Sequence, residues 1–290
     1  MTLPDDLPIV DHHCHLSPTG EGVAAARRFR EAGGTHLFLA TQNYAPRVPT
    51  TEAEYVAQFE TTERLARRVH EETGTVVYPV IAPYPIDLVH AAPDLGVAGA
   101  LQLQLRALDR AGAWIRDRRA VALGEVGRAH FPVPEPVAAA LATVFEYALA
   151  IARDAGCPAV VHSEELDRAG YRQLAELARR IGLAPERVVK HYARSRVPAE
   201  ERDGIAPSYV ARRELVREVA RDPAPWFLET DFLDDPKRPG AVLDLTTVPR
   251  RARAAGERSA PERDALRVPF VESVERVYGL RPIVERGVPA

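Results

Sequence analysis

The chain has 290 residues, of which 46% are hydrophobic and 27% charged, enough apolar material for one large core. Its formal net charge of -3 excludes an overall basic field for nucleic acid, so any phosphate contact has to be local. The two cysteines exclude a disulfide framework. The N-terminal residues lack the features of a signal peptide, and no apolar run reaches the roughly 18 residues of a membrane span. We therefore expect a cytoplasmic protein with no membrane partner.

Short apolar, β-branched segments alternate with alanine-rich, charged segments. The apolar segments predict eight strands, at residues 9–13, 36–41, 76–82, 121–126, 159–162, 188–191, 204–207 and 227–231. Many are continuously apolar, as expected of a parallel sheet covered on both faces. The charged segments predict helices, at residues 22–32, 52–73, 97–118, 136–155, 168–181, 208–221 and 268–278.

Eight strands alternating with helices favour an α/β fold of the (β/α)8 TIM barrel type over a doubly wound sheet. We expect residues 1–290 to form a single barrel domain. The Arg-rich segment 243–264 follows the last predicted strand. It is either a lid or a surface connection, and surface connections are the commoner of the two.

The first predicted strand runs into the sequence Asp11-His12-His13-Cys14-His15. Successive strand side chains point to opposite faces, so we expect Asp11, His13 and His15 to share the inward face. His12 and Cys14 then face the other way. Two imidazoles spaced i, i+2 at a strand end can hold one divalent cation. Asp11 either orients a ligand imidazole or bonds to the backbone as a buried strand residue.

Four later strand ends carry further ligand types: Glu125 on the fourth strand, His162 on the fifth, His191 on the sixth and Asp231 on the eighth. In a barrel these carboxyl ends meet at one mouth, where active sites lie. Each residue alone has an ordinary alternative, such as a rim histidine, a salt-bridge partner or a helix cap. Five such strand ends together favour a metal site at the C-terminal ends of the strands.

The six candidate ligands are His13, His15, Glu125, His162, His191 and Asp231. They exceed the four of a tetrahedral zinc site. Two divalent ions roughly 3.5–4 Å apart would use them all. Glu125 is the candidate able to bridge, because a carboxylate has two oxygens to share. Imidazole-rich ligation predicts zinc first, with manganese, iron or magnesium as alternatives.

These motifs resemble the TatD-type metal-dependent hydrolases, the TatD-related deoxyribonuclease family of the amidohydrolase superfamily. The family's Asp-x-His-x-His, Gly-Glu-x-Gly and Glu-Thr-Asp motifs and its single histidines at strands five and six are matched by residues 11–15, 124–127, 229–231, 162 and 191. Residues 229–242 are similar to an archaeal-type branch. The resemblance implies a (β/α)8 barrel, two divalent ions and hydrolysis, and for the best-known members exonucleolytic cleavage of DNA.

Two features depart from the bacterial nucleases of that family. Gly127-Arg128-Ala129-His130 stands where they usually have Gly-Leu-Asp, and Glu164 stands where they often have arginine. A negative charge at position 164 would repel a phosphodiester. Neither departure changes a candidate metal ligand, but both affect the expectation that the substrate is DNA.

The expected mechanism is attack of a metal-bound hydroxide on a phosphorus or carbonyl centre. Asp231 would act as general base, and Glu125 is the second candidate catalytic residue. Arg128 and His130 are the candidate substrate-binding residues, since arginine presents a planar fork to phosphate. A surface arginine on a loop is the alternative for Arg128.

Three functions remain open. The first is a phosphodiesterase acting on nucleic-acid ends, with single-stranded DNA as substrate. The second is a small-molecule hydrolase of a lactone, amide or phosphate ester on the same metal site. The third is a non-catalytic metal-binding scaffold, which is disfavoured because structural zinc sites are usually closed four-ligand cages. No feature of the sequence implies a protein partner.

Overall fold

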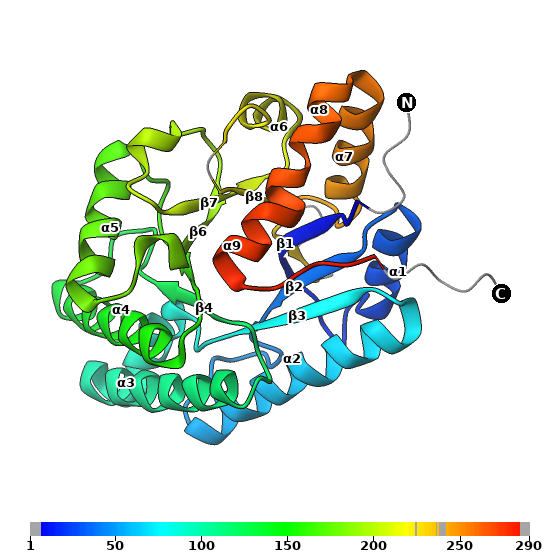
Figure 1. Ribbon diagram of the computed structural model, residues 1–290. Coiled ribbons are helices and arrows are strands. Elements are labelled where there is room, and N and C mark those ends of the chain that lie inside the picture. The colour runs from blue at the N-terminus through cyan, green and yellow to red at the C-terminus, as the bar shows by residue number, and fades with distance from the viewer. Residues whose placement is uncertain (1–6, 224, 236, 238–241, 285–290) are drawn as a thin grey trace.

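The computed structural model describes residues 7–223, 225–235, 237 and 242–284. Parallel strands form one curved sheet in the order β8-β7-β6-β5-β4-β3-β2-β1-β9, and helices surround it (Figure 1). The strands are β1 (Val10–His15), β2 (His36–Ala40), β3 (Val76–Ile81), β4 (Ala122–Gly127), β5 (Ala159–His162), β6 (Val188–Ala193), β7 (Ala206–Val210), β8 (Phe227–Glu229) and β9 (Phe232–Leu233). The α/β fold of the (β/α)8 TIM barrel type, predicted from the sequence, is thereby confirmed.

The helices are α1 (Val23–Glu31), α2 (Glu52–Thr73), α3 (Pro85–Arg116), α4 (Glu135–Ala155), α5 (Arg168–Ile181), α6 (Arg213–Val219), α7 (Thr247–Arg258), α8 (Ala260–Ala265) and α9 (Ser273–Tyr278). Local signals set several ends. A capping box between Thr51 and Glu54 begins α2, and Gly74, with a φ of 68°, ends it. The long α3 is kinked at Gly96, which lies outside helical backbone angles.

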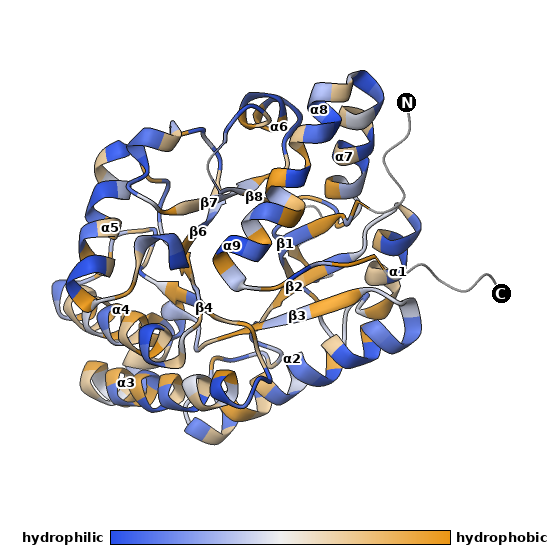
Figure 2. Cartoon of the chain, viewed as in Figure 1, coloured by the Kyte–Doolittle hydropathy of each residue, from blue (hydrophilic) through white to orange (hydrophobic). Residues whose placement is uncertain are grey.

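One buried cluster takes a side chain from every strand of the barrel and fills its interior: Val10, Phe38, Val80, Ala122, Val160, Val189, Ala206 and Phe227. A second cluster lies between the sheet and the helices α2 to α5. Hydrophobic residues accordingly concentrate on the strands, and hydrophilic ones on the outer helix faces (Figure 2). Since both faces of the sheet are buried, many of the strands are apolar on both faces.

Helix α9 lies across one mouth of the barrel (Figure 1). Its Tyr278 hydroxyl is 2.6 Å from Nε2 of His12, and the His12 ring stacks on Phe227 at 4.0 Å. His12 thus points into the barrel, and the prediction that it faces outward is wrong. The pairing of β1 with β2 shifts register between Asp11 and Cys14, and this irregularity breaks the alternation of faces.

Other differences from the predicted elements lie in the second half of the chain. Residues 208–210 belong to β7, so the helix predicted at 208–221 is reduced to α6. The segment 243–264 forms α7 and α8, and α7 contacts β1. The last predicted strand is interrupted after Glu229, and the short β9 that follows pairs with β1.

Among the described residues one helix, α4, is long and apolar enough to cross a membrane by length and composition alone. Half of its most apolar window is buried inside the protein. Val137, Leu141 and Phe145 of this helix pack in the cluster between sheet and helices. Packing of this kind is typical of a core helix.

Candidate metal centre

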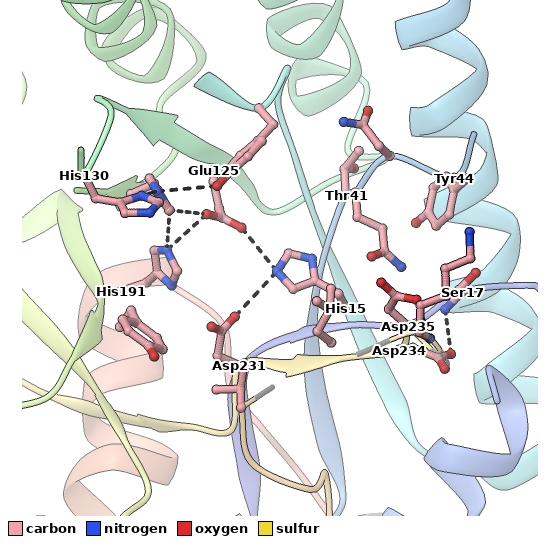
Figure 3. Close-up of a pocket in the computed structure, with 18 of the residues that line it drawn as sticks. His15, Ser17, Thr41, Tyr44, Glu125, His130, His191, Asp231, Asp234 and Asp235 are labelled. Carbon is pink, nitrogen blue, oxygen red and sulfur yellow. Dashed lines mark hydrogen bonds and ion pairs between the residues drawn. The ribbon is translucent and has the colours of Figure 1, made fainter. Parts of the chain in front are cut away.

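The six predicted ligand side chains converge at the carboxyl ends of the strands. They come from β1 (His13, His15), β4 (Glu125), β5 (His162), β6 (His191) and the residue two places after β8 (Asp231). Figure 3 shows the labelled members of this set, His15, Glu125, His191 and Asp231, facing one another. The structure therefore brings together residues that are up to 218 positions apart, as the barrel prediction requires.

Glu125 lies at the middle of the cluster. Its Oε1 is 3.3 Å from Nε2 of His13 and 3.2 Å from Nε2 of His15. Its Oε2 is 2.8 Å from Nδ1 of His162 and 3.0 Å from Nε2 of His191. Each oxygen of one carboxylate thus faces its own pair of imidazoles, which is the arrangement expected of a bridging ligand.

The six ligands provide two groups whose donor atoms lie within 4.8 Å of one another: His13, His15 and Asp231 in one, and Glu125, His162 and His191 in the other. A third such group joins His13 and His191 to Glu229. Imidazole nitrogens with carboxylate oxygens are the donor set that zinc and its neighbours prefer. The residues present therefore fit a pair of divalent ions.

The carboxylates dominate the electrostatics of the cluster. Burial would raise the pKa of Glu125, but the neighbouring His191 and the hydrogen bonds from the other histidines hold it well below the usual value. Burial likewise opposes charge on the histidines, yet Glu125 and Glu229 raise the pKa of His191 to about 10. Asp231 and Glu125 raise that of His15 to about 9. The site attracts positive charge strongly, which favours cation binding.

The cluster opens into a cavity of about 1040 Å³. Its walls come from the loops after several strands and include Ser17, Thr19, Thr41, Gln42, Asn43, Tyr44, Tyr84, His130, Ser163, Glu164, Glu165, Tyr192, Arg194, Asp234, Asp235 and Lys237. Three tyrosines that follow strand ends, Tyr44, Tyr84 and Tyr192, are part of this wall. Tyr209, in β7, is fully buried in the core instead.

The two candidate substrate-binding residues differ in position. His130 lines the cavity, and its Nδ1 is 2.9 Å from Nε2 of His162. Arg128 borders a separate, smaller pocket, and its guanidinium forms two hydrogen bonds with the carboxylate of Glu164, one of them 3.0 Å long. The structure therefore directs His130 toward the candidate metal centre and Arg128 toward Glu164.

A family model described as TatD related DNase matches residues 10–279. The chain belongs to this family. A curated relative, the uncharacterized protein MJ1127 of Methanocaldococcus jannaschii, is 30% identical over 277 residues, which cover 94% of this chain and 96% of the relative.

Solved structures share the fold of this TatD family member. The TatD homolog YJJV of Escherichia coli is 20% identical with a TM-score of 0.62, and the match covers 94% of this chain and 98% of that one. A mutant of a PTE-like lactonase from Deinococcus radiodurans is 15% identical with a TM-score of 0.56, covering 94% of this chain and 96% of the other.

Asp11 opens the motif that the chain shares with the TatD family. Its Oδ1 accepts hydrogen bonds from the backbone N–H groups of His13, at 3.2 Å, and Thr230, at 3.0 Å. Of the two roles considered for Asp11, the structure thus shows the one of a buried strand residue bonded to backbone.

Asp234 supports the loops around the candidate metal centre, and sequence reasoning missed it. Its carboxylate accepts hydrogen bonds from the backbone N–H groups of Ser17, Glu21 and Gly22, at 2.7–2.8 Å. A Cβ at Gly20 would lie 2.2 Å from Oδ1 of Asp234, so this approach requires glycine. The contact ties the loop after β1 to the segment after β9. No local pattern signals a contact over 217 positions.

Proposed function

We propose that this TatD family protein is a metal-dependent hydrolase that uses two divalent ions, held by the six clustered ligands, to cleave phosphodiester bonds at DNA ends. The observation that carries the proposal is the placement of the Glu125 carboxylate between two pairs of imidazoles. The family description, TatD related DNase, supports the choice of a phosphodiester. Zinc is the ion we propose first, because four of the six clustered ligands are imidazoles.

The residues of the cluster and of the cavity wall have different roles in the proposed reaction. Divalent ions bound there would supply Lewis acidity toward the scissile ester and lower the pKa of water. Glu125 and the histidines would hold these ions in place. Asp231, whose side chain is 17% exposed at the edge of the cluster, is placed to accept a proton from attacking water as general base. His130, beside His162 in the cavity wall, is placed to contact the substrate or its leaving group.

A second candidate substrate is a small uncharged ester, lactone or amide, and the charge of the cavity favours it. Among the described residues that line the cavity, the carboxylates are Glu125, Glu164, Glu165, Asp231, Asp234 and Asp235. The basic residues in the same wall are Arg194 and Lys237, and Arg194 pairs with Glu165 at 3.4 Å. A single-stranded nucleic acid needs a basic groove along its backbone. The lactonase title of a structural neighbour agrees with this candidate.

A hydrolysis screen separates these functions. Metal-replete wild type is tested on labelled single-stranded DNA and, in parallel, on small esters, lactones and amides, with Glu125→Gln as the inactive control. Release of nucleotides supports the first candidate, and turnover of small substrates alone supports the second. A lack of turnover on every panel would favour the metal-binding scaffold.

Metal content tests the site independently of the substrate. Purification without chelators, or refeeding after chelation, should give about two ions per chain. The control is Glu71→Gln, which changes an exposed carboxylate on α2 far from the cluster in the fold. A stoichiometry near zero after refeeding would refute the proposed centre.

A further inference from the structure

His191 presents its two ring nitrogens to two different carboxylates. Nε2 faces the cluster and lies 3.0 Å from Oε2 of Glu125. Nδ1 faces the opposite way and lies 3.6 Å from Oε1 of Glu229. Glu229 is the last residue of β8 and its side chain is fully buried. A second carboxylate therefore stands behind the ring, on the side away from the candidate ions.

Glu229 has hydrogen-bonding capacity that the described residues leave unused. Its Oε1 accepts the backbone N–H of Tyr192 at 2.6 Å. Within the described part of the chain, Oε2 of Glu229 and Nδ1 of His191 have no hydrogen-bond partner. A buried polar atom without a partner is destabilising, and a small closure of the 3.6 Å gap between Nδ1 and Oε1 would give Nδ1 its partner.

We propose that Glu229 is a positioning residue, which accepts the Nδ1–H of His191 and so leaves the Nε2 lone pair for a metal ion beside Glu125. The inference rests on the metal centre proposed above. A metal-bound histidine usually donates its other ring N–H to a carboxylate or carbonyl, which fixes the tautomer and the ring orientation. The 3.6 Å separation needs only a small closure, and such contacts are often longer in the absence of ligand.

The backbone around His191 is held in the same way. The Lys190 ammonium donates to the carbonyl oxygen of His191, and Lys190 itself is buried. Tyr192 has a φ of 56°, in the left-handed region, and its amide is the one that Glu229 accepts. The pairing of β6 with β7 shifts register between Lys190 and Ala193, at the same place as this bend in the backbone. Glu229 thus stabilises both the ring and the turn that follows it.

The variant Glu229→Gln separates these two roles. The amide oxygen of glutamine can still accept the Tyr192 N–H, so the turn is preserved. Oε1 is also the atom that faces Nδ1 of His191, and in the neutral amide it accepts the ring N–H more weakly than it does in a carboxylate. We expect zinc affinity, measured by competition with a chromophoric chelator, to fall about 10–100-fold while the far-UV circular dichroism of the metal-free protein stays unchanged.

The matched control is Asp87→Asn. Asp87 is also buried, but it accepts hydrogen bonds from Asn43 and Tyr55, and among the described residues no hydrogen bond or ion pair joins it to a candidate ligand. Its zinc affinity should equal that of wild type. Zinc affinity of Glu229→Gln equal to wild type would overturn the positioning role alone. Failure of wild type to bind zinc would overturn the metal centre and the positioning role together.

A measurement on the wild type decides the question even where Glu229→Gln does not fold. Histidine side-chain ¹⁵N spectra of the zinc-loaded protein, with His191 assigned from His191→Asn, report which ring nitrogen carries hydrogen. We expect Nδ1 to be protonated and Nε2 to be bound to zinc. A protonated Nε2, or zinc bound to Nδ1, would contradict the inference.

Discussion

The hydroxyl of Thr230 donates a 2.7 Å hydrogen bond to Oδ2 of Asp11. Both residues are fully buried. Thr230 directly follows β8 and Asp11 lies in β1, so the bond joins the last and first strands of the barrel where they lie side by side. The same two segments carry Asp231 and His13. This contact therefore supports both the closure of the barrel and the geometry of the candidate metal centre.

Replacing Thr230 with valine removes this hydroxyl at nearly constant volume. The change leaves a buried carboxylate oxygen of Asp11 without its donor and also removes the acceptor for the Phe232 N–H. We expect the free energy of unfolding in urea to fall by about 1–3 kcal/mol. Thr143→Val, at an exposed site on α4, should change it by less than about 0.5 kcal/mol. Equal effects of the two variants would refute a structural role for the Thr230 hydroxyl.

Asp231→Asn tests the proposed general base. Asparagine keeps an oxygen that can approach His15, at the place where Asp231 now lies 3.6 Å away, so substantial metal should remain bound. The amide cannot accept a proton from water, and we expect turnover to fall roughly 10²–10⁴-fold. Metal analysis and steady-state kinetics on the same preparation measure both effects. Undiminished hydrolysis would reject the role of Asp231 as base.

The strand ends were predictable because buried parallel strands have apolar sequences. A polar residue directly after such a run therefore marks the end of the strand. His162 follows Ala159-Val160-Val161, and His191 follows Val188-Val189-Lys190. Once the barrel was inferred, topology alone placed such residues at one mouth.

The orientation of side chains within β1 was not predictable in the same way. Alternation placed His12 outward, but the irregular register between Asp11 and Cys14 turns it toward Phe227 inside the barrel. A bulge depends on the partner strand and leaves no local signal. The hydrogen bonds of Asp234 with the loop after β1 could not be predicted for the same reason, because they join segments that are distant in the sequence.

The helix predicted over 208–221 shows tertiary context overriding local pattern. Ser208 and Tyr209 precede a charged, helix-forming stretch, yet both are fully buried in β7. Pairing of β7 with β6 and β8 holds these residues extended. Propensity alone could not weigh that pairing.

Glu164→Gln tests whether the negative charge at position 164 slows the cleavage of a phosphodiester substrate. The wild-type carboxylate faces the cavity and holds the Arg128 guanidinium. Neutralising it removes a repulsive charge and frees an arginine that can bind phosphate. At low salt we expect kcat/KM for single-stranded DNA to rise about 3–10-fold, while that for a neutral ester stays constant.

The double variant Arg128→Met/Glu164→Gln is the matched control for that experiment. It removes the same carboxylate but leaves no arginine to bind phosphate, so it should show a smaller gain on DNA than Glu164→Gln. Equal gains would assign the effect to the lost carboxylate alone. No gain in either variant would argue against a phosphodiester in this part of the cavity.

Burial of His36 should make the free energy of unfolding depend on pH. His36 is buried in β2 with Nδ1 2.7 Å from the Thr35 hydroxyl, and burial, with a smaller effect of Arg30, lowers its pKa to about 4. The unfolded chain, with a value near 6.5, binds the proton more readily. The contribution of neutral His36 is therefore complete above pH 6.5 and is lost as the pH falls toward 4, by about 3 kcal/mol. Urea unfolding at pH 7 and at pH 4 gives the free energy of unfolding at each pH. Its decrease between pH 7 and pH 4 should be smaller in His36→Gln than in wild type by this amount, because the other titrating groups contribute equally to both proteins. The same loss in both would show that His36 is not the group responsible.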